Sequence, residues 1–316
     1  MDQRVSTAQP ITFPAADGYP LKGFRWRHPD VDAARPVVIV NAATSVRCRY
    51  YARFAAFLHA HGFDVVTYDY RGIGESRPAS LSGFEAGWID WGRLDFEAAL
   101  QYALAEFPGQ PVQVAAHSVG GFLIGLAASG HHITRVFTMG AQYAYWRDYA
   151  RDKRAGMFLK WHVFMPAATA LFGYFPGGRL GWLEDTPHGV VRDWIAPQPR
   201  FEDIWRRGGA RVLTEAERRK LVERFAAMRG PTLAVSLSDD EFGTPAAIRR
   251  LLGYYRNSAR THLHLRPEAV GERQVGHFAF FHSRFEHTLW KIPLAWLRHG
   301  RLPAEPQGEA VTLRAE

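Results

Sequence analysis

PVQVAAHSVGG, residues 111–121, is the stretch that decides the fold of this chain of 316 residues. It begins as a short apolar run typical of a buried strand and ends in a serine between small residues. The apolar segment 122–128 follows at once and predicts a buried helix. A strand, a sharp turn that carries a serine, and a helix form a nucleophile elbow, whose strained turn needs small residues on both sides of the serine. Those places hold Ala116 and Gly120; the usual pattern has glycine at the first, so the pentapeptide alone also fits an ordinary strand-to-helix turn.

The composition predicts one large domain, or a domain with an insertion. Hydrophobic residues make up 47% of the chain, which is enough for a sizeable core. Residues 1–7 lack the apolar core of a signal peptide, and no run reaches the roughly 18 apolar residues of a spanning helix. The one cysteine, Cys48, excludes an internal disulfide and a cysteine-based metal site. We therefore expect a soluble, cytoplasmic protein.

The formal charge of +8 raises the question of an anionic partner. The arginines are scattered, and no recognised nucleic-acid module is present, so we expect a solvated basic surface and no nucleic-acid partner. His262 and His264 share a strand face without a third ligand at metal spacing. Gly72 and Gly74 lack the third glycine of a dinucleotide-binding turn. The sequence therefore predicts neither a metal nor a cofactor.

Strands and helices alternate along most of the chain, which predicts a doubly wound, mostly parallel α/β sheet. Besides the strand before Ser118, the pattern predicts an antiparallel hairpin from 11–13 and 21–26, and strands at 37–40, 63–68, 136–139, 231–237 and 262–265. It predicts helices at 49–61, 84–107, 122–128, 245–255 and 285–299.

The alternation stops between about 142 and 229, where the chain is patchily helical and rich in aromatic residues. Ligands of parallel sheets bind at the carboxyl ends of the strands, and an insertion before the last two strands is expected to cover those ends. We therefore predict two core segments at 1–141 and 230–300, a helical cap at 142–229 and a polar tail at 301–316. An amphipathic helical linker is the alternative for the insertion. Within it, the apolar stretch 156–175 favours a wall of the cap over a membrane-surface helix.

A serine hydroxyl is a weak nucleophile that needs a base and an acid to orient the base. After a nucleophile elbow the chain order is serine, acid, histidine. SDDEF at 238–242 follows the strand after the insertion, and GHF at 276–278 follows the last strand. Three independent placements agree, which favours a nucleophile at Ser118 over an ordinary turn. His117 is expected to pack in the core with its side chain pointing away from the base.

Over roughly residues 10 to 300 the chain resembles the α/β-hydrolase superfamily. The resemblance rests on the serine, acid and histidine motifs together with DYRGIGES at 69–76 and Trp91-Gly92 with Asp95. Within the superfamily, the chain is similar to bacterial predicted α/β hydrolases of the serine esterase and lysophospholipase type. This resemblance implies the α/β-hydrolase fold with an inserted helical cap, and it implies a serine hydrolase.

The resemblance also implies the roles of three residues, with Ser118 as nucleophile, Asp240 as acid and His277 as base. Aligning Phe242 with the family pattern favours Asp240, and Asp239 is the alternative. Because adjacent residues at the end of a strand point opposite ways, only one of the two is expected to reach His277.

An oxyanion hole in such a fold is made of backbone N–H groups. One donor is expected from the residue after the serine, Val119. The second is expected from the loop after strand 37–40, which reads NAATS at 41–45 and lacks the His-Gly pair common in the superfamily. Either Ala43 or Thr44 is expected to supply it.

The expected function is hydrolysis of a small-molecule carboxylic ester through an acyl-enzyme on Ser118. The insertion offers many aromatic and few charged residues for a pocket, so a hydrophobic acyl or aromatic group of moderate size is expected. Acyl transfer with the same three residues is one alternative, because the two reactions differ in how well the pocket excludes water. A non-catalytic ligand-binding protein on the same fold is another, although a pure binder has no need of all three residues. The sequence leaves the oligomeric state open.

Overall fold

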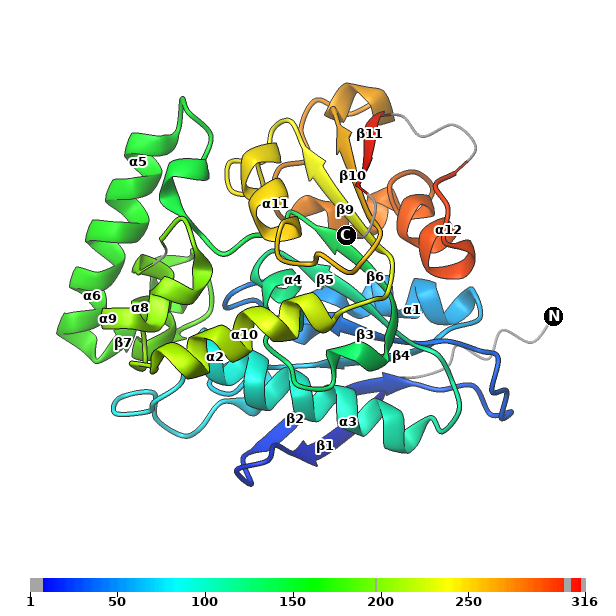
Figure 1. Ribbon diagram of the computed structural model, residues 1–316, viewed down its shortest axis with the longest axis horizontal. Coiled ribbons are helices and arrows are strands. Elements are labelled where there is room, and N and C mark those ends of the chain that lie inside the picture. Colours follow the sequence, from blue (N-terminus) through cyan, green and yellow to red (C-terminus); the bar gives the residue numbers. More distant parts are fainter. Residues whose placement is uncertain (1–7, 197, 304–307, 314–316) are drawn as a thin grey trace.

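The computed structural model describes residues 8–196, 198–303 and 308–313, and it is built around one nine-stranded sheet. The strands follow the order β1-β2-β4-β3-β5-β6-β9-β10-β11 (Figure 1). Their bounds are Gln9–Pro14 (β1), Pro20–Trp26 (β2), Val37–Asn41 (β3), Asp64–Tyr68 (β4), Val112–His117 (β5), Ile133–Met139 (β6), Thr232–Leu237 (β9), Arg260–Leu265 (β10) and Gly308–Leu313 (β11). The six neighbours from β4 to β10 pair in parallel. The predicted doubly wound, mostly parallel sheet is confirmed.

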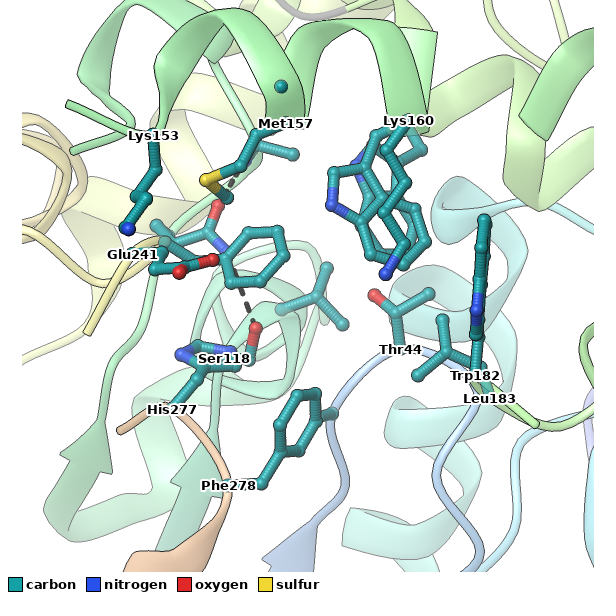
Figure 2. A pocket seen from close by; sticks show the side chains of 18 of the residues that line it. Thr44, Ser118, Lys153, Met157, Lys160, Trp182, Leu183, Glu241, His277 and Phe278 are labelled. Carbon is teal, nitrogen blue, oxygen red and sulfur yellow. Dashed lines mark hydrogen bonds between the residues drawn. The ribbon is translucent and has the colours of Figure 1, made fainter. Parts of the chain in front are cut away.

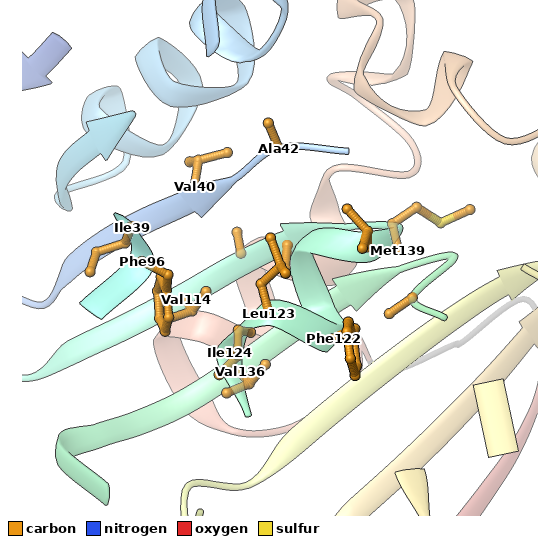
Figure 3. Close-up of a cluster of buried hydrophobic side chains, with 14 of the residues drawn as sticks. Ile39, Val40, Ala42, Phe96, Val114, Phe122, Leu123, Ile124, Val136 and Met139 are labelled. Carbon is orange, nitrogen blue, oxygen red and sulfur yellow. The ribbon is translucent and has the colours of Figure 1, made fainter. Parts of the chain in front are cut away.

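The central strands are apolar along their whole length because both faces of the sheet are covered. Every residue of β3, β4 and β5 is buried. Ile39, Val114 and Val136 from the strands meet Phe96 and Phe122 from the helices in one core (Figure 3). This packing fixes the carboxyl ends of β3, β5, β6 and β9 side by side, which is where ligands of parallel sheets bind.

Helices cover both faces of the sheet (Figure 1). On one face, α1 (Ala52–Ala60) packs through Phe54 and Phe57 on Trp290, which directly precedes α12 (Lys291–His299). The other face carries α2 (Trp88–Asp90), α3 (Glu97–Glu106), α4 (Val119–Ile124) and α10 (Glu215–Ala227). A further helix, α11 (Pro245–Leu252), connects β9 to β10.

The helix predicted over 84–107 begins later, at Trp88, and is interrupted by the π-helical segment η3 (Trp91–Phe96). The interrupted part packs against the chain that follows α4. A Cβ on Gly92 would come within 2.5 Å of Leu126 Cβ, so the two segments touch at this glycine. The π-helical geometry is thus found where the helix makes its closest approach to a neighbour.

Between β6 and β9 the chain leaves the sheet and forms an insertion, residues 140–231. It contains α5 (Arg154–Phe158), the π-helical η6 (Leu159–Phe164), α6 (Met165–Phe172), α7 (Gly177–Leu180), α8 (His188–Ile195), α9 (Ile204–Arg207), α10, and the short strands β7 (Tyr174–Phe175) and β8 (Thr186–Pro187). In Figure 1, α5, α6 and α8 lie beside the sheet, away from its two covered faces. Within the described ranges no helix is long and apolar enough to cross a membrane.

The predicted polar tail at 301–316 is corrected at one point, because residues 308–313 form β11. This strand pairs antiparallel with β10, from Gly308 opposite Leu265 to Leu313 opposite Arg260. Its sequence, GEAVTL, is short and stands among polar residues, and the open edge of β10 supplies the backbone partners that make it a strand. Residues 304–307 and 314–316 of the predicted tail, and 1–7 of the first core segment, lie outside the described residues.

The predicted hairpin forms the opposite edge of the sheet from β1 and β2. Its turn contains Gly18 with φ 80°, a value that favours glycine. The Ala15 N–H donates to the Tyr19 carbonyl at 2.9 Å and closes the hairpin. The outer strand β1 reads QPITFP and so carries a proline at its second and its last position.

Candidate active site

Ser118 lies in the turn between β5 and α4 with φ 54° and ψ −127°. Such a backbone is strained for any residue but glycine, so its surroundings must hold it. The Ser118 N–H donates to the Met139 carbonyl at 2.9 Å. Gly120 lets α4 approach the end of β3, since a Cβ on Gly120 would come within 2.6 Å of the Asn41 carbonyl oxygen. Ala116, the departure from the usual pattern, is fully buried in β5, and the strained turn forms with alanine at that place.

His277 and Asp240 form a buried hydrogen-bonded pair. Nδ1 of His277 lies 2.7 Å from Oδ2 of Asp240, and the two side chains are 7% and 0% exposed. Because the carboxylate accepts at Nδ1, that nitrogen carries the proton and Nε2 is left to face other groups. Oδ1 of Asp240 accepts from the N–H groups of Phe242 at 2.8 Å and Gly243 at 2.7 Å, which fixes the carboxylate.

Two glycines make room for this pair. A Cβ on Gly140 would come within 2.8 Å of Asp240 Oδ2 and 3.0 Å of His277 Cε1, and Gly140 also has φ 60°. A Cβ on Gly243 would come within 2.6 Å of Gly140 Cα. Neither glycine was predicted from the sequence as a site residue. Their positions, directly after β6 and just after the acid, are the signal that could have found them.

Asp239 has different partners from its neighbour. Its Oδ2 accepts from the N–H groups of Val275 at 2.7 Å and Gly276 at 2.8 Å. The structure therefore brings Asp240 to the ring of His277, while Asp239 holds the loop that leads to it.

Gln142 is a site residue that the sequence analysis missed. Its Nε2 donates to Ser118 Oγ at 3.3 Å, and its Oε1 accepts from the N–H of Ala144, so the amide is held by its own turn. Gln142 follows β6, the neighbour of β5 in the sheet, and this place at the carboxyl edge is the signal that points to it. Ser118 and His277 line the same cavity (Figure 2), although the described contacts include no hydrogen bond between them.

His117 joins three parts of the site through one chain of hydrogen bonds. Its Nε2 lies 2.8 Å from the His277 carbonyl oxygen and its Nδ1 2.8 Å from the Tyr51 hydroxyl. A carbonyl oxygen can only accept, so Nε2 of His117 carries the ring proton. Nδ1 is then an acceptor, and the Tyr51 hydroxyl donates to it. The same Tyr51 oxygen accepts from the Ala43 N–H at 2.9 Å. Burial and the neighbouring His277 lower the pKa of His117 well below its usual value, which suits this neutral ring. The expectation that His117 points away from the base is wrong, because its ring contacts the base's own backbone.

The two predicted oxyanion donors after β3 differ in their contacts. Ala43 already donates its N–H to Tyr51, whereas the described residues give the N–H of Thr44 no partner. Val119 begins α4, and the first N–H groups of a helix have no partner within it. Ala43, Thr44 and Val119 all line the cavity beside Ser118.

The site opens into a cavity of about 430 Å³, which is within the usual range for small-molecule pockets. One wall comes from the sheet side, with Ser118 and His277, and the other comes largely from the insertion (Figure 2). The lining is strongly aromatic, with Trp88, Trp161, Trp182, Trp194, Phe242 and Phe278. Lys153, Lys160 and Glu241 are the lysine and acidic residues of this lining.

One group among the described residues, His28 with His59 and Asp64, has ligand atoms within 4.8 Å of one another and could hold a metal ion. The group is engaged in other contacts, however. His28 Nε2 lies 3.1 Å from the His59 carbonyl, and Asp64 Oδ1 accepts from the His28 N–H at 2.7 Å. The guanidinium of Arg35 lies 4.0 Å from Asp64, where it would repel a cation. None of these residues lines the cavity of Ser118.

Comparison with known proteins agrees with this geometry. The family model Hydrolase_4, described as serine aminopeptidase, S33, matches residues 32–270. Among solved structures, the chain is similar to DcsB in complex with a substrate analogue, with TM-score 0.62 and 13% identity over 93% of this chain and 100% of that one. It is similar to the esterase domain of a Rhodothermus marinus protein, with TM-score 0.56 and 17% identity over 92% and 98% of the two chains. It is also similar to an esterase of Pyrococcus furiosus, with TM-score 0.54 and 14% identity over 92% and 91%. At these identities the likenesses show a shared fold. No curated protein matches the sequence.

Proposed function

Because the chain belongs to the serine aminopeptidase S33 family of α/β hydrolases, we propose that it is a serine hydrolase that cleaves carboxylic esters through an acyl-enzyme on Ser118. One observation carries the proposal. A serine held at φ 54° lines the same cavity as a histidine whose other ring nitrogen is bound to a buried aspartate. This combination of a strained serine and an oriented base is what nucleophilic catalysis by a hydroxyl requires.

In the proposed reaction Ser118 Oγ attacks the ester carbonyl and its proton moves to Nε2 of His277. The tetrahedral intermediate collapses, and His277 returns that proton to the departing alkoxide, so an alcohol leaves and an acyl-serine remains. A water molecule then attacks the acyl group and gives its proton to His277; the bond from the acyl carbon to Oγ breaks, His277 returns the proton to Oγ, and the acid is released. Asp240 holds the ring and stabilises its charged form throughout. Gln142 keeps the resting hydroxyl in place until a substrate displaces that contact.

We assign the oxyanion hole to the backbone N–H groups of Val119 and Thr44. The bond from Ala43 to Tyr51 supports Thr44 over Ala43, because a donor engaged in a buried hydrogen bond is not free for the substrate. Ala43 then has a supporting role, in that its bond to Tyr51 fixes the loop that carries Thr44.

The predicted cap, 142–229, supplies the substrate pocket in this proposal. Trp161, Trp182 and Trp194 from this segment line the cavity, which supports an acyl or aromatic group of moderate size. The family description and the likeness to esterases leave the leaving group open between an alcohol and an amine. The cavity favours esters over peptides with a free N-terminus, since two lysines and one glutamate give its lining a positive balance that repels an α-ammonium group.

A fluorophosphonate probe tests the nucleophile directly, because it reacts only with an activated serine. We expect the wild type to be labelled and Ser118→Ala to remain unlabelled, as measured by mass spectrometry of the intact protein. Ser238→Ala is the matched control, since Ser238 is exposed beside the acid and should leave the labelling in place. Equal labelling of Ser118→Ala and wild type would refute the proposal. Product analysis with added alcohols then separates hydrolysis from acyl transfer, and a p-nitrophenyl ester series of increasing acyl length measures the pocket.

A further inference from the structure

Lys160 reaches the cavity from the insertion through an irregular turn of helix. It lies in η6, the π-helical segment between α5 and α6, and π-helical turns within α-helices are frequent at functional sites. Its Nζ lies 4.5 Å from the ring centre of Trp161 and 4.0 Å from that of Trp182. Figure 2 shows the ammonium directed into the cavity from the helix side, across from Ser118. The two rings thus hold a positive charge inside the pocket.

In the described part of the chain, no carboxylate lies within ion-pair distance of this charge. Among the described residues, Lys160 has neither an ion pair nor a hydrogen bond, and its neighbours in the cavity wall are mainly aromatic. The partial burial of its ammonium lowers the pKa of Lys160, and the charge of Glu241 opposes that shift. Lys153, the other lysine of the cavity, differs because it is 57% exposed and lies 3.8 Å from Asp152.

A half-buried ammonium between aromatic rings loses part of its hydration, and a ligand can replace what is lost. An aromatic face attracts a cation but does not accept its three N–H donors. Arg71, a buried cation of this chain, lies between the carboxylates of Asp17 and Asp95. A group that combines negative charge with hydrogen-bond acceptors would satisfy the free donors of Lys160.

We propose that Lys160 is an anion-binding residue of the substrate pocket, so that the preferred esters carry a carboxylate or phosphate group away from the scissile bond. The inference rests on the proposed function and names its substrate class. The ester carbonyl lies at Ser118, the chain of the substrate packs along the tryptophans, and the anion binds Nζ of Lys160. A purely structural Lys160, which only fills the aromatic wall, would affect neutral and anionic substrates alike.

Substrates matched in size test the charge alone. The p-nitrophenyl monoester of adipic acid is compared with the p-nitrophenyl ester of adipamic acid, in which an amide replaces the carboxylate. A third ester, from phosphonovaleric acid, distinguishes a preference for phosphate from one for carboxylate. The measured quantity is the ratio of kcat/KM for each anionic ester to that for the neutral one.

We expect Lys160→Met to lower this ratio about 10- to 100-fold, the effect of losing a hydrogen bond between charged groups. Lys160→Arg should restore most of it, and rising salt concentration should reduce the ratio in wild type. Lys220→Met, at an exposed lysine of α10 that does not line the cavity, is the matched control and should keep the wild-type ratio. If Lys160→Met changes kcat/KM of anionic and neutral esters by the same factor, Lys160 is structural and the inference is overturned.

A binding measurement separates this inference from the proposed function. In Ser118→Ala, monomethyl adipate should quench the fluorescence of the cavity tryptophans at lower concentration than methyl adipamate, and the added Lys160→Met change should remove that difference. If no ester is cleaved by wild type but this difference is present, the esterase proposal fails and the anion site stands. If esters are cleaved but the two ligands bind Ser118→Ala equally, the anion site fails and the esterase proposal stands.

Discussion

Asp239 and Asp240 are neighbours in the chain that hold different parts of the site. Asp240 accepts from His277, whereas Asp239 accepts from the backbone N–H groups of Val275 and Gly276. Both residues lie in the turn that follows β9, where the Asp240 N–H donates to the Leu237 carbonyl at 3.1 Å, and from this turn one side chain contacts the base and the other contacts the loop before it. In the proposed mechanism, therefore, Asp240 is the acid and Asp239 positions the loop.

Replacing each aspartate by asparagine separates these roles. Asp240→Asn should lower kcat about 10³- to 10⁴-fold, because an amide at this place favours the wrong tautomer of His277 and does not stabilise its charged form. Asp239→Asn keeps an acceptor oxygen for the two N–H groups and should retain most of the activity. Steady-state kinetics on one p-nitrophenyl ester measure both variants. A larger loss in Asp239→Asn than in Asp240→Asn would contradict the assignment.

The sequence allowed part of the site to be predicted for a physical reason. Ser118, the acid and His277 each follow a strand of a parallel sheet, and strand order alone places such residues at one edge. Strand order also places Gln142 at this edge but does not show that its side chain reaches Ser118, and it gives no place to Lys160. The direction of their side chains depends on local geometry, which for Gln142 is a turn after β6 and for Lys160 a π-helical segment.

At the scale of elements, α4 and α10 are fitted to each other through one glycine. A Cβ on Gly125 would come within 2.3 Å of the ring of Phe225. That ring is fully buried and packs on Phe122 and Phe201, so it has little room to move. Gly125 itself has φ −72°, a backbone that alanine adopts freely, so only the contact requires glycine.

Gly125→Ala should therefore lower the free energy of unfolding by about 1–3 kcal/mol through overpacking. Gly156→Ala is the matched control, because Gly156 lies in α5 with no heavy atom within 4 Å of an added Cβ. There the substitution should be neutral or raise stability by up to about 1 kcal/mol, as helix propensity predicts. Urea unfolding of both variants measures the difference. Equal stability of the two variants would contradict this prediction and would show that the Phe225 ring moves aside for the added methyl group.

Periodicity predicted the regular elements better than the irregular ones. The buried strands β3, β4 and β5 are apolar throughout, and that pattern is readable because it follows from burial on both faces. The π-helical segments η3 and η6 lie inside longer helical stretches, and the apolar pattern that predicts a helix does not distinguish them from α-helix. β11 is a strand because β10 offers an edge, which no local pattern records.

At the scale of the whole molecule, the insertion is joined to the sheet domain by buried polar groups. Within the insertion, Asp193 of α8 accepts from Trp205 Nε1 at 2.9 Å and from the Ala210 N–H at 2.6 Å. It also accepts from the N–H of Ile89, which lies outside the insertion, at 3.4 Å. Ser45 after β3 bonds through its hydroxyl to Thr186 at 2.6 Å. The position of the pocket wall over Ser118 thus depends on a few specific contacts.

The protonation of Asp193 should make stability depend on pH. Burial raises the pKa of Asp193 from 3.8 to about 7, against the opposing effect of its hydrogen bonds. Between these values the folded protein keeps a proton that the unfolded chain has lost, so this group's contribution to stability falls as pH rises. The quantity to compare is the free energy of unfolding of wild type minus that of Asp193→Asn. This difference should fall by at most about 1.4 kcal/mol per pH unit up to about pH 7 and then level off. Urea titrations across this range measure it, and a difference that rises with pH would contradict the assignment.

The prolines of β1 affect whether two copies of this molecule can associate through the edges of their sheets. The Ala15 N–H closes the hairpin on Tyr19, and N–H groups alternate in direction along an antiparallel strand, so odd-numbered residues of β1 face β2 and even-numbered residues face outward. Pro10 and Pro14 therefore stand on the outer side, where each removes a donor that an incoming strand would need. In the described part of the chain this edge is a poor template for strand addition, which protects the sheet from edge-to-edge aggregation at high concentration.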